Sequence, residues 1–130
     1  MRRHAFGFLI VFIGGGLGSM LRHAMNQAGG ALLGPDFPYS TMFVNISGSL
    51  AMGLIAGWFA FRGGGGQTWP LFLTTGILGG FTTFSTFSLD VAVMWERGQA
   101  VRTAIYVLGS FIPAIICVFL GLTIMRGSLR

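Results

Sequence analysis

The chain has 130 residues, of which 53% are hydrophobic and only 8% are charged, and its mean hydropathy is positive. This composition indicates a membrane protein and excludes an ordinary water-soluble domain. The net charge of +5 comes entirely from arginine, with no basic run and no alternation of basic and aromatic residues, so it suits phospholipid headgroups and predicts no nucleic-acid partner.

The first predicted membrane helix spans residues 4 to 28. Arg2 and Arg3 precede its apolar run as they would in a signal peptide, but no small-residue cleavage site follows promptly. Gly14 and Gly18 are four residues apart, which predicts a face where another helix can approach closely. The segment is therefore interpreted as a membrane helix with a glycine packing stripe.

A charged residue, Arg22, stands near the far end of this first helix. Its guanidinium must reach the membrane surface, pair with another group or line a wet vestibule, and the sequence leaves these alternatives open. Residues 26 to 30 are polar or glycine-rich and predict the helix end. The Gly-Pro-Asp-Phe-Pro sequence at 34 to 38 then predicts a turn.

A polar stripe marks the second predicted helix, residues 40 to 61. Thr41, Asn45 and Ser49 follow one another at four-residue spacing, so their side chains share one helix face. An amide in hydrocarbon needs hydrogen-bond partners. Asn45 could form an interhelical hydrogen bond or donate to a passing anion, and both interpretations stay open.

The third segment, residues 69 to 97, is long enough to cross a bilayer but carries a polar, glycine-rich centre at 76 to 88. Glycines weaken a helix, and clustered hydroxyls offer the backbone alternative partners. We therefore expect a helix broken at its centre. Such backbone is tolerated at membrane depth only where protein buries it or where it lines an aqueous cavity, so this stretch is a candidate ion or solute site.

A half-helix that begins after this break would direct its N–H groups and positive dipole end toward the bilayer centre, which favours an anion. Phe84 and Phe87 lie at helical spacing in this half-helix. Their ring edges could contact an anion, although packing is the commoner role for such a pair. Asp90 follows as an intramembrane carboxylate and hence a candidate functional group.

The fourth predicted helix spans residues 101 to 125. Tyr106 and Ser110 lie four residues apart on it and could either face the same site as Asn45 or pack against the third segment. Cys117 is the sole cysteine, which excludes an intrachain disulfide and a cysteine metal site.

Three stretches of the chain together carry a family resemblance. Residues 14–22, 44–49 and 79–88 have the sequences GGGLGSMLR, VNISGS and GGFTTFSTFS. In this order they resemble the Fluc (CrcB) family of fluoride channels, whose length and four-helix plan match nearly the whole chain. The resemblance implies a single transmembrane channel domain over residues 1–130, an all-α membrane protein that acts as a passive, fluoride-selective exporter in the bacterial plasma or inner membrane.

Assembly and site residues are also implied by the resemblance. It implies an antiparallel, dual-topology homodimer with two pores and a structural sodium ion at its centre, bound by the backbone carbonyls of Gly79 and Thr82. The implied fluoride pathway comprises a vestibule arginine, a pore asparagine, two pore phenylalanines, a polar track and a fourth-helix polar pair: Arg22, Asn45, Phe84, Phe87, Ser85, Thr86, Tyr106 and Ser110. Asp90 is implied to lie near one pore mouth.

The arginine distribution gives only a weak orientation signal. The side of the N-terminus carries five arginines, namely Arg2, Arg3, Arg62, Arg126 and Arg130, against Arg97 and Arg102 on the other side, with Arg22 as a third if it reaches that surface. Five against three is compatible with insertion both ways, whereas five against two would favour the N-terminus inside. The resemblance favours dual topology.

Two other function classes compete with the channel interpretation. A small four-helix proton-coupled exporter of cations would need a buried carboxylate, and only Asp90 could serve. A non-transporting membrane scaffold would use the same polar residues for packing alone. An intramembrane protease is disfavoured, because His4 and His23 have no serine partner suitably placed at depth.

Overall fold

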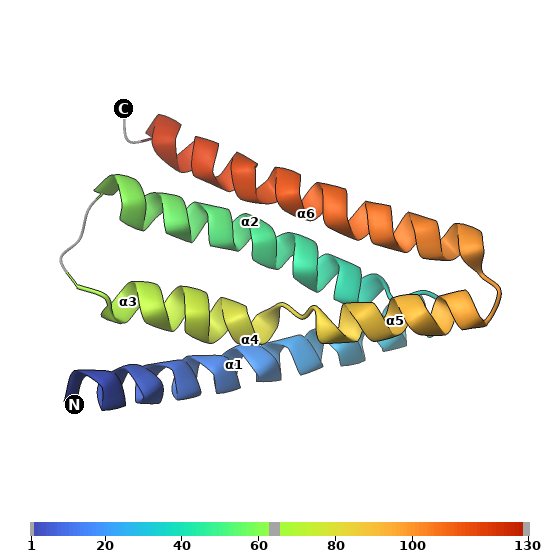
Figure 1. Ribbon diagram of the computed structural model, residues 1–130, viewed down its shortest axis with the longest axis horizontal. Coiled ribbons are helices and arrows are strands. Elements are labelled where there is room, and N and C mark those ends of the chain that lie inside the picture. Colours follow the sequence, from blue (N-terminus) through green and yellow to red (C-terminus); the bar gives the residue numbers. More distant parts are fainter. Residues whose placement is uncertain (1, 63–65, 129–130) are drawn as a thin grey trace.

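The computed structural model describes residues 2–62 and 66–128, and the regular elements in these ranges are helices (Figure 1). Four stretches are long and apolar enough to cross a membrane: His4–Leu33, Tyr39–Phe61, Thr68–Glu96 and Ala100–Gly127. The predicted all-α membrane class with four spanning segments is therefore confirmed. Arg130, which was counted in the orientation argument, lies outside the described residues, as do the side chains of Arg3 and Arg62.

The first helix, α1 (Arg2–Leu33), continues beyond its predicted end at residue 28. Gly29 is a packing position, because a Cβ atom built there would lie 2.6 Å from the Ser40 Cβ atom. The helix ends at Gly34, whose φ of +81° favours glycine and whose N–H donates to the Gly30 carbonyl at 3.2 Å. Gly29, one of the residues that suggested a helix end, thus serves close contact instead.

Two long helices, α2 (Tyr39–Arg62) and α6 (Ala100–Ser128), pack along each other and run in the same direction (Figure 1). Gly53 faces the backbone of Val118, so the two helices approach closely. Among the described residues, these two helices form the most extensive contact between elements.

The third span consists of four short elements. These are α3 (Thr68–Pro70), the π-helix η1 (Leu71–Leu78), α4 (Gly79–Phe81) and α5 (Ser85–Glu96). Thr82 follows α4 with extended backbone, at φ −81° and ψ 155°. Three residues, 82 to 84, therefore lie between α4 and α5 outside any helix.

Helix α1 packs along η1 and α4 through glycine contacts. Gly14 faces Gly76, and Gly18 faces the backbone of Ile77. This arrangement confirms the predicted glycine packing stripe on α1. On the other side of η1 and α4, Leu78 and Phe81 form a small core with Val44 of α2.

Substitution of Gly14 by alanine is expected to destabilise the bundle. The new Cβ atom would lie 2.9 Å from both the Gly76 Cα atom and the Phe72 carbonyl oxygen, and overpacking of this kind costs about 1–3 kcal/mol. Gly16→Ala on the same helix is the matched control, because its Cβ would meet nothing within 4 Å. Thermal unfolding of the purified variants in detergent measures the difference. Equal transition temperatures for the two variants would contradict the packing role of Gly14.

Candidate functional site

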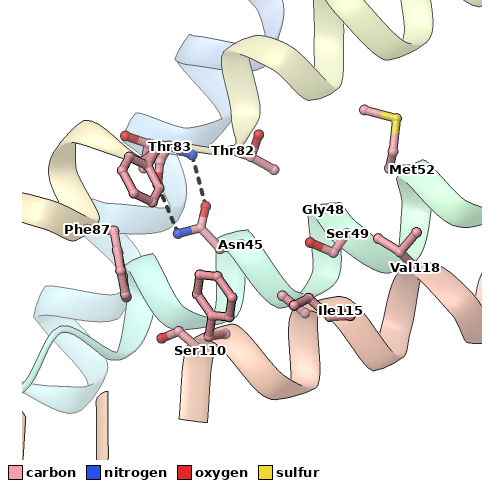
Figure 2. A pocket seen from close by; sticks show the side chains of 13 residues that line it. Asn45, Gly48, Ser49, Met52, Thr82, Thr83, Phe87, Ser110, Ile115 and Val118 are labelled. Atoms are coloured by element: carbon pink, nitrogen blue, oxygen red, sulfur yellow. Dashed lines mark hydrogen bonds between the residues drawn. The ribbon is translucent and has the colours of Figure 1, made fainter. Parts of the chain in front are cut away.

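A pocket of about 300 Å³, here called the central pocket, lies between α2, α6 and the connection from α4 to α5 (Figure 2). Its wall combines an amide and several hydroxyls with aromatic and aliphatic groups. The lining residues are Asn45, Gly48, Ser49, Met52, Thr82, Thr83, Phe84, Phe87, Ser110, Phe111, Ala114, Ile115 and Val118. No acidic or basic side chain belongs to this set of described residues.

The Asn45 side chain pairs with the backbone of Thr83 through two hydrogen bonds (Figure 2). Its Nδ2 atom donates to the Thr83 carbonyl at 3.0 Å, and its Oδ1 atom accepts from the Thr83 N–H at 2.9 Å. The amide thereby satisfies both backbone polar groups of Thr83, a residue that lies outside a helix. One of the two Nδ2 hydrogens remains for another acceptor.

Hydroxyl groups complete the local backbone bonding around Thr83. The Thr82 N–H and hydroxyl both donate to the Leu78 carbonyl, at 3.0 and 2.9 Å. The Thr83 hydroxyl accepts from the Thr86 N–H at 3.2 Å, which satisfies one of the donors that a helix start leaves unpaired. Thr82 therefore hydrogen-bonds back to the end of η1, and Thr83 provides a hydrogen-bond acceptor for the start of α5.

Four of the predicted pathway residues meet at the central pocket: Asn45, Phe84, Phe87 and Ser110. The ring centroids of Phe84 and Phe87 are 6.0 Å apart. Ser110 is only 4% exposed, and its Oγ atom is buried with no hydrogen-bond partner in the structure. A buried hydroxyl costs free energy unless something accepts its hydrogen, so Ser110 marks a position where an acceptor is suited to bind.

Tyr106 does not line the central pocket but lies one helical turn from Ser110 along α6, closer to the start of that helix. Its side chain is fully buried, and its hydroxyl donates to the Asp90 Oδ2 atom at 2.9 Å. Thr41, also buried, adds a third polar side chain beside this pair. Phe87 links the two groups of residues, because its ring centroid lies 5.1 Å from that of Tyr106.

The contact between Tyr106 and Asp90 was not anticipated from the sequence, although a signal for it exists. Helices α5 and α6 form a hairpin around the turn at residues 97–99. Asp90 and Tyr106 stand at equal sequence separation from the two helix ends that flank this turn, Glu96 and Ala100. Residues at matching depths of a helical hairpin are neighbours, and this register would have paired them.

The other predicted pathway residues lie outside the central pocket. Ser85 is exposed, and Thr86 is half-buried with its N–H directed to Thr83. Arg22 is half-buried, and its Nε atom donates to the Gly80 carbonyl at 3.1 Å. Of the three alternatives for this arginine, pairing with another group is the one that the structure shows.

The backbone carbonyl oxygens of Gly79 and Thr82, near the residues between α4 and α5, are possible ligands for a hard cation. In a continuous helix the Gly79 and Thr82 carbonyls would accept from the N–H groups of Thr83 and Thr86. These N–H groups donate instead to side-chain oxygens of Asn45 and Thr83. The carbonyl oxygens of Gly79 and Thr82 are therefore hard ligands of the kind that a sodium ion prefers. The described residues contain no cluster of three metal-binding His, Cys, Asp or Glu side chains.

The four spans and the central pocket together define a small polytopic membrane protein with a polar, uncharged pocket between its helices. Residues 9–122 match a family model described as "CrcB-like protein, Camphor Resistance (CrcB)". The chain belongs to this CrcB family, and the resemblance found in the sequence is confirmed.

Relatives of the chain share its length and much of its sequence. It is 59% identical over 119 residues to the "Fluoride-specific ion channel FluC" of Rhodopseudomonas palustris (strain BisB5), which covers 92% of this chain and 96% of the relative. It is 58% identical to the protein of the same name from Methylobacterium nodulans, over 91% of this chain and 94% of the relative. A third, from Paracoccus denitrificans, is 51% identical over 92% and 94% of the two chains.

These comparisons bear on class and location. The relatives are ion channels, which are not enzymes, and they give no support to a proton-coupled cation exporter. Together with the four apolar spans, they identify the chain as a multi-pass bacterial membrane protein.

Replacement of Asn45 by alanine is expected to lower the thermal stability of the protein. It would leave the Thr83 N–H and carbonyl without their partners, and each unsatisfied buried group costs about 1–3 kcal/mol. Ser47→Ala on the same helix is the control, because the Ser47 hydroxyl donates only to carbonyls of its own helix turn. Unfolding monitored by intrinsic fluorescence in detergent checks this, and an Asn45→Ala transition equal to that of Ser47→Ala would contradict it.

Proposed function

We propose that this chain is a passive, fluoride-selective ion channel that exports fluoride from the cytoplasm and relieves fluoride toxicity. The observation that carries the proposal is the buried Ser110 hydroxyl, which lines the central pocket and has no acceptor in the structure. The remaining Nδ2 hydrogen of Asn45 and the rings of Phe84 and Phe87 lie around the same pocket. The names of the relatives, which are fluoride-specific ion channels, support the choice of fluoride.

The chemistry of the central pocket suits an anion that must leave its water. Fluoride is small and strongly hydrated, so a pathway has to replace water with hydrogen-bond donors while binding weakly enough for release. Neutral amide and hydroxyl donors and positive ring edges provide this without a fixed charge that would hold the ion. A negative interior drives an anion outward by about 2.3 kcal/mol per charge per 100 mV, so export needs no pump.

The proposed pathway extends beyond the central pocket. Tyr106 lies one turn nearer the start of α6 than Ser110 and is proposed to border the pathway with its ring, since its hydroxyl hydrogen is donated to Asp90. Ser85 and Thr86 are proposed to add hydroxyls on α5. Arg22 is proposed to line the vestibule, where its guanidinium attracts anions, in addition to its bond to Gly80.

A second copy of the chain is proposed to complete the pathway as an antiparallel, dual-topology homodimer. Phe84 lines the central pocket and yet is 73% exposed, so the pocket opens on one side of the single chain. A polar wall cannot face acyl chains at membrane depth, and protein must cover it. The arginine count of five against three, which includes Arg22 on the far side, allows insertion in both orientations.

The interruption between α4 and α5 is proposed to act as a functional break in the third helix and as a structural sodium site. The carbonyl oxygens of Gly79 and Thr82 fit a hard cation, since their usual N–H partners donate elsewhere. A sodium ion bound there would be coordinated by these two carbonyl oxygens, whose lone pairs have lost their usual N–H donors.

Liposomes containing the purified protein are expected to release fluoride rapidly and chloride not at all. Efflux is followed with a fluoride electrode and a chloride electrode, and a potassium ionophore sets the membrane potential. Protein-free liposomes are the control. A folded protein that releases no fluoride would contradict the proposed function.

The proposed role of the Phe84 and Phe87 rings can be tested separately. Phe84→Ile and Phe87→Ile are each expected to slow fluoride efflux by about tenfold or more, because an aliphatic side chain has no positive ring edge for the anion. Phe8→Ile is the matched control, since Phe8 is 76% exposed near the start of α1. If the Phe84→Ile and Phe87→Ile variants release fluoride as fast as the control, these two rings do not belong to the pathway.

A further inference from the structure

Phe37, in the connection between α1 and α2, packs its ring against the buried ring of Tyr106. The two ring centroids are 5.6 Å apart with an interplanar angle of 85°, an edge-to-face contact. Phe37 is half-buried and also meets the Tyr39 ring at 4.7 Å. Its backbone is fixed as well, because its carbonyl accepts from the Tyr39 N–H at 2.8 Å and the following Pro38 restricts its conformation.

Tyr106 is thereby held by contacts from separate elements. Phe37 comes from the connection before α2, whereas Phe87 on α5 lies 5.1 Å from the Tyr106 ring. Asp90, one turn beyond Phe87, accepts the hydrogen of the Tyr106 hydroxyl at 2.9 Å. The position of that hydroxyl depends on the ring, and the ring is in contact with two other aromatic rings, those of Phe37 and Phe87.

We propose that Phe37 is a positioning residue for ion conduction, which acts by confining Tyr106 so that its hydroxyl stays on Asp90. This inference rests on the proposed channel function. Asp90 is a carboxylate about one helical turn from the central pocket, and an uncompensated negative charge there repels an anion. The hydrogen from Tyr106 offsets part of that charge. Removal of the Phe37 ring leaves room for Tyr106 to rotate, after which Thr41 is the polar side chain that remains beside the carboxylate.

The first test compares fluoride efflux from liposomes for wild type and Phe37→Ala. Efflux is expected to fall about 3- to 10-fold, in line with the loss of one aromatic contact that holds a polar group. Phe37→Tyr keeps the ring edge and is expected to restore efflux to within about twofold of wild type. Leu33→Ala is the control, because Leu33 precedes the same connection and is 59% exposed.

A double-mutant cycle separates positioning from simple anchoring of the connection. Tyr106→Phe removes the hydroxyl but keeps the ring, so Phe37→Ala is expected to slow efflux in that background by less than about twofold. An equal fold-loss in both backgrounds would mean that Phe37 acts independently of the Tyr106 hydroxyl, and would overturn the inference. If Phe37→Ala does not fold, Phe37→Leu takes its place with the same expected outcomes.

The outcomes also distinguish this inference from the proposed function. Wild-type protein that conducts fluoride, together with Phe37→Ala protein that conducts equally well, overturns the inference and leaves the channel function intact. Wild-type protein that carries no fluoride overturns both.

Discussion

The pair of hydrogen bonds between the Asn45 side chain and the Thr83 backbone is the interaction on which the rest of the site depends. A backbone that leaves the helix in hydrocarbon exposes an N–H and a carbonyl, and both need partners. A carboxamide offers one donor and one acceptor side by side, and Asn45 places them against the N–H and the carbonyl of a single residue, Thr83. Because α2 supplies this group, the interruption in the third span is tied to a neighbouring helix and keeps a fixed position.

Several features follow from that fixed position. The turn from α4 to α5 brings Phe84 and Phe87 to the wall of the central pocket, opposite Ser110 of α6. It also removes the Thr83 N–H from the helix ladder, which leaves the Gly79 carbonyl without its usual donor. The glycine contacts of α1 with η1 hold the other half of the span, so neither side of the interruption can slide freely.

Much of the fold could be predicted from the sequence, because apolar length alone decides which segments span a membrane. The four spans were predicted on that basis, and the close contacts of Gly14 and Gly18 were predicted from the four-residue spacing of these glycines. The end of α1 was placed too early, since glycine is used both to end helices and to let chains touch, and only the position of Ser40 separates these uses.

The candidate site was predictable in part. The four-residue spacing predicted that Asn45 shares a helix face with Thr41 and Ser49, but spacing on one helix cannot show what lies opposite that face. The structure shows that Thr83 does. The partnership of Tyr106 with Asp90 depends on the register of the α5–α6 hairpin, and the role of Phe37 depends on how a connection folds back, which helical periodicity does not describe.

The shared direction of α2 and α6 has a consequence for the energy profile of an ion in transit. Polar side chains recur every four residues on both helices, at Thr41, Asn45 and Ser49 and at Tyr106 and Ser110, so matching rungs lie about 6 Å apart along the bundle. In the proposed pathway, an ion that moved from one rung to the next would exchange its ligands a few at a time and would never be stripped of all of them. A pathway of evenly spaced, shallow minima permits fast hopping, whereas one deep well would trap the ion.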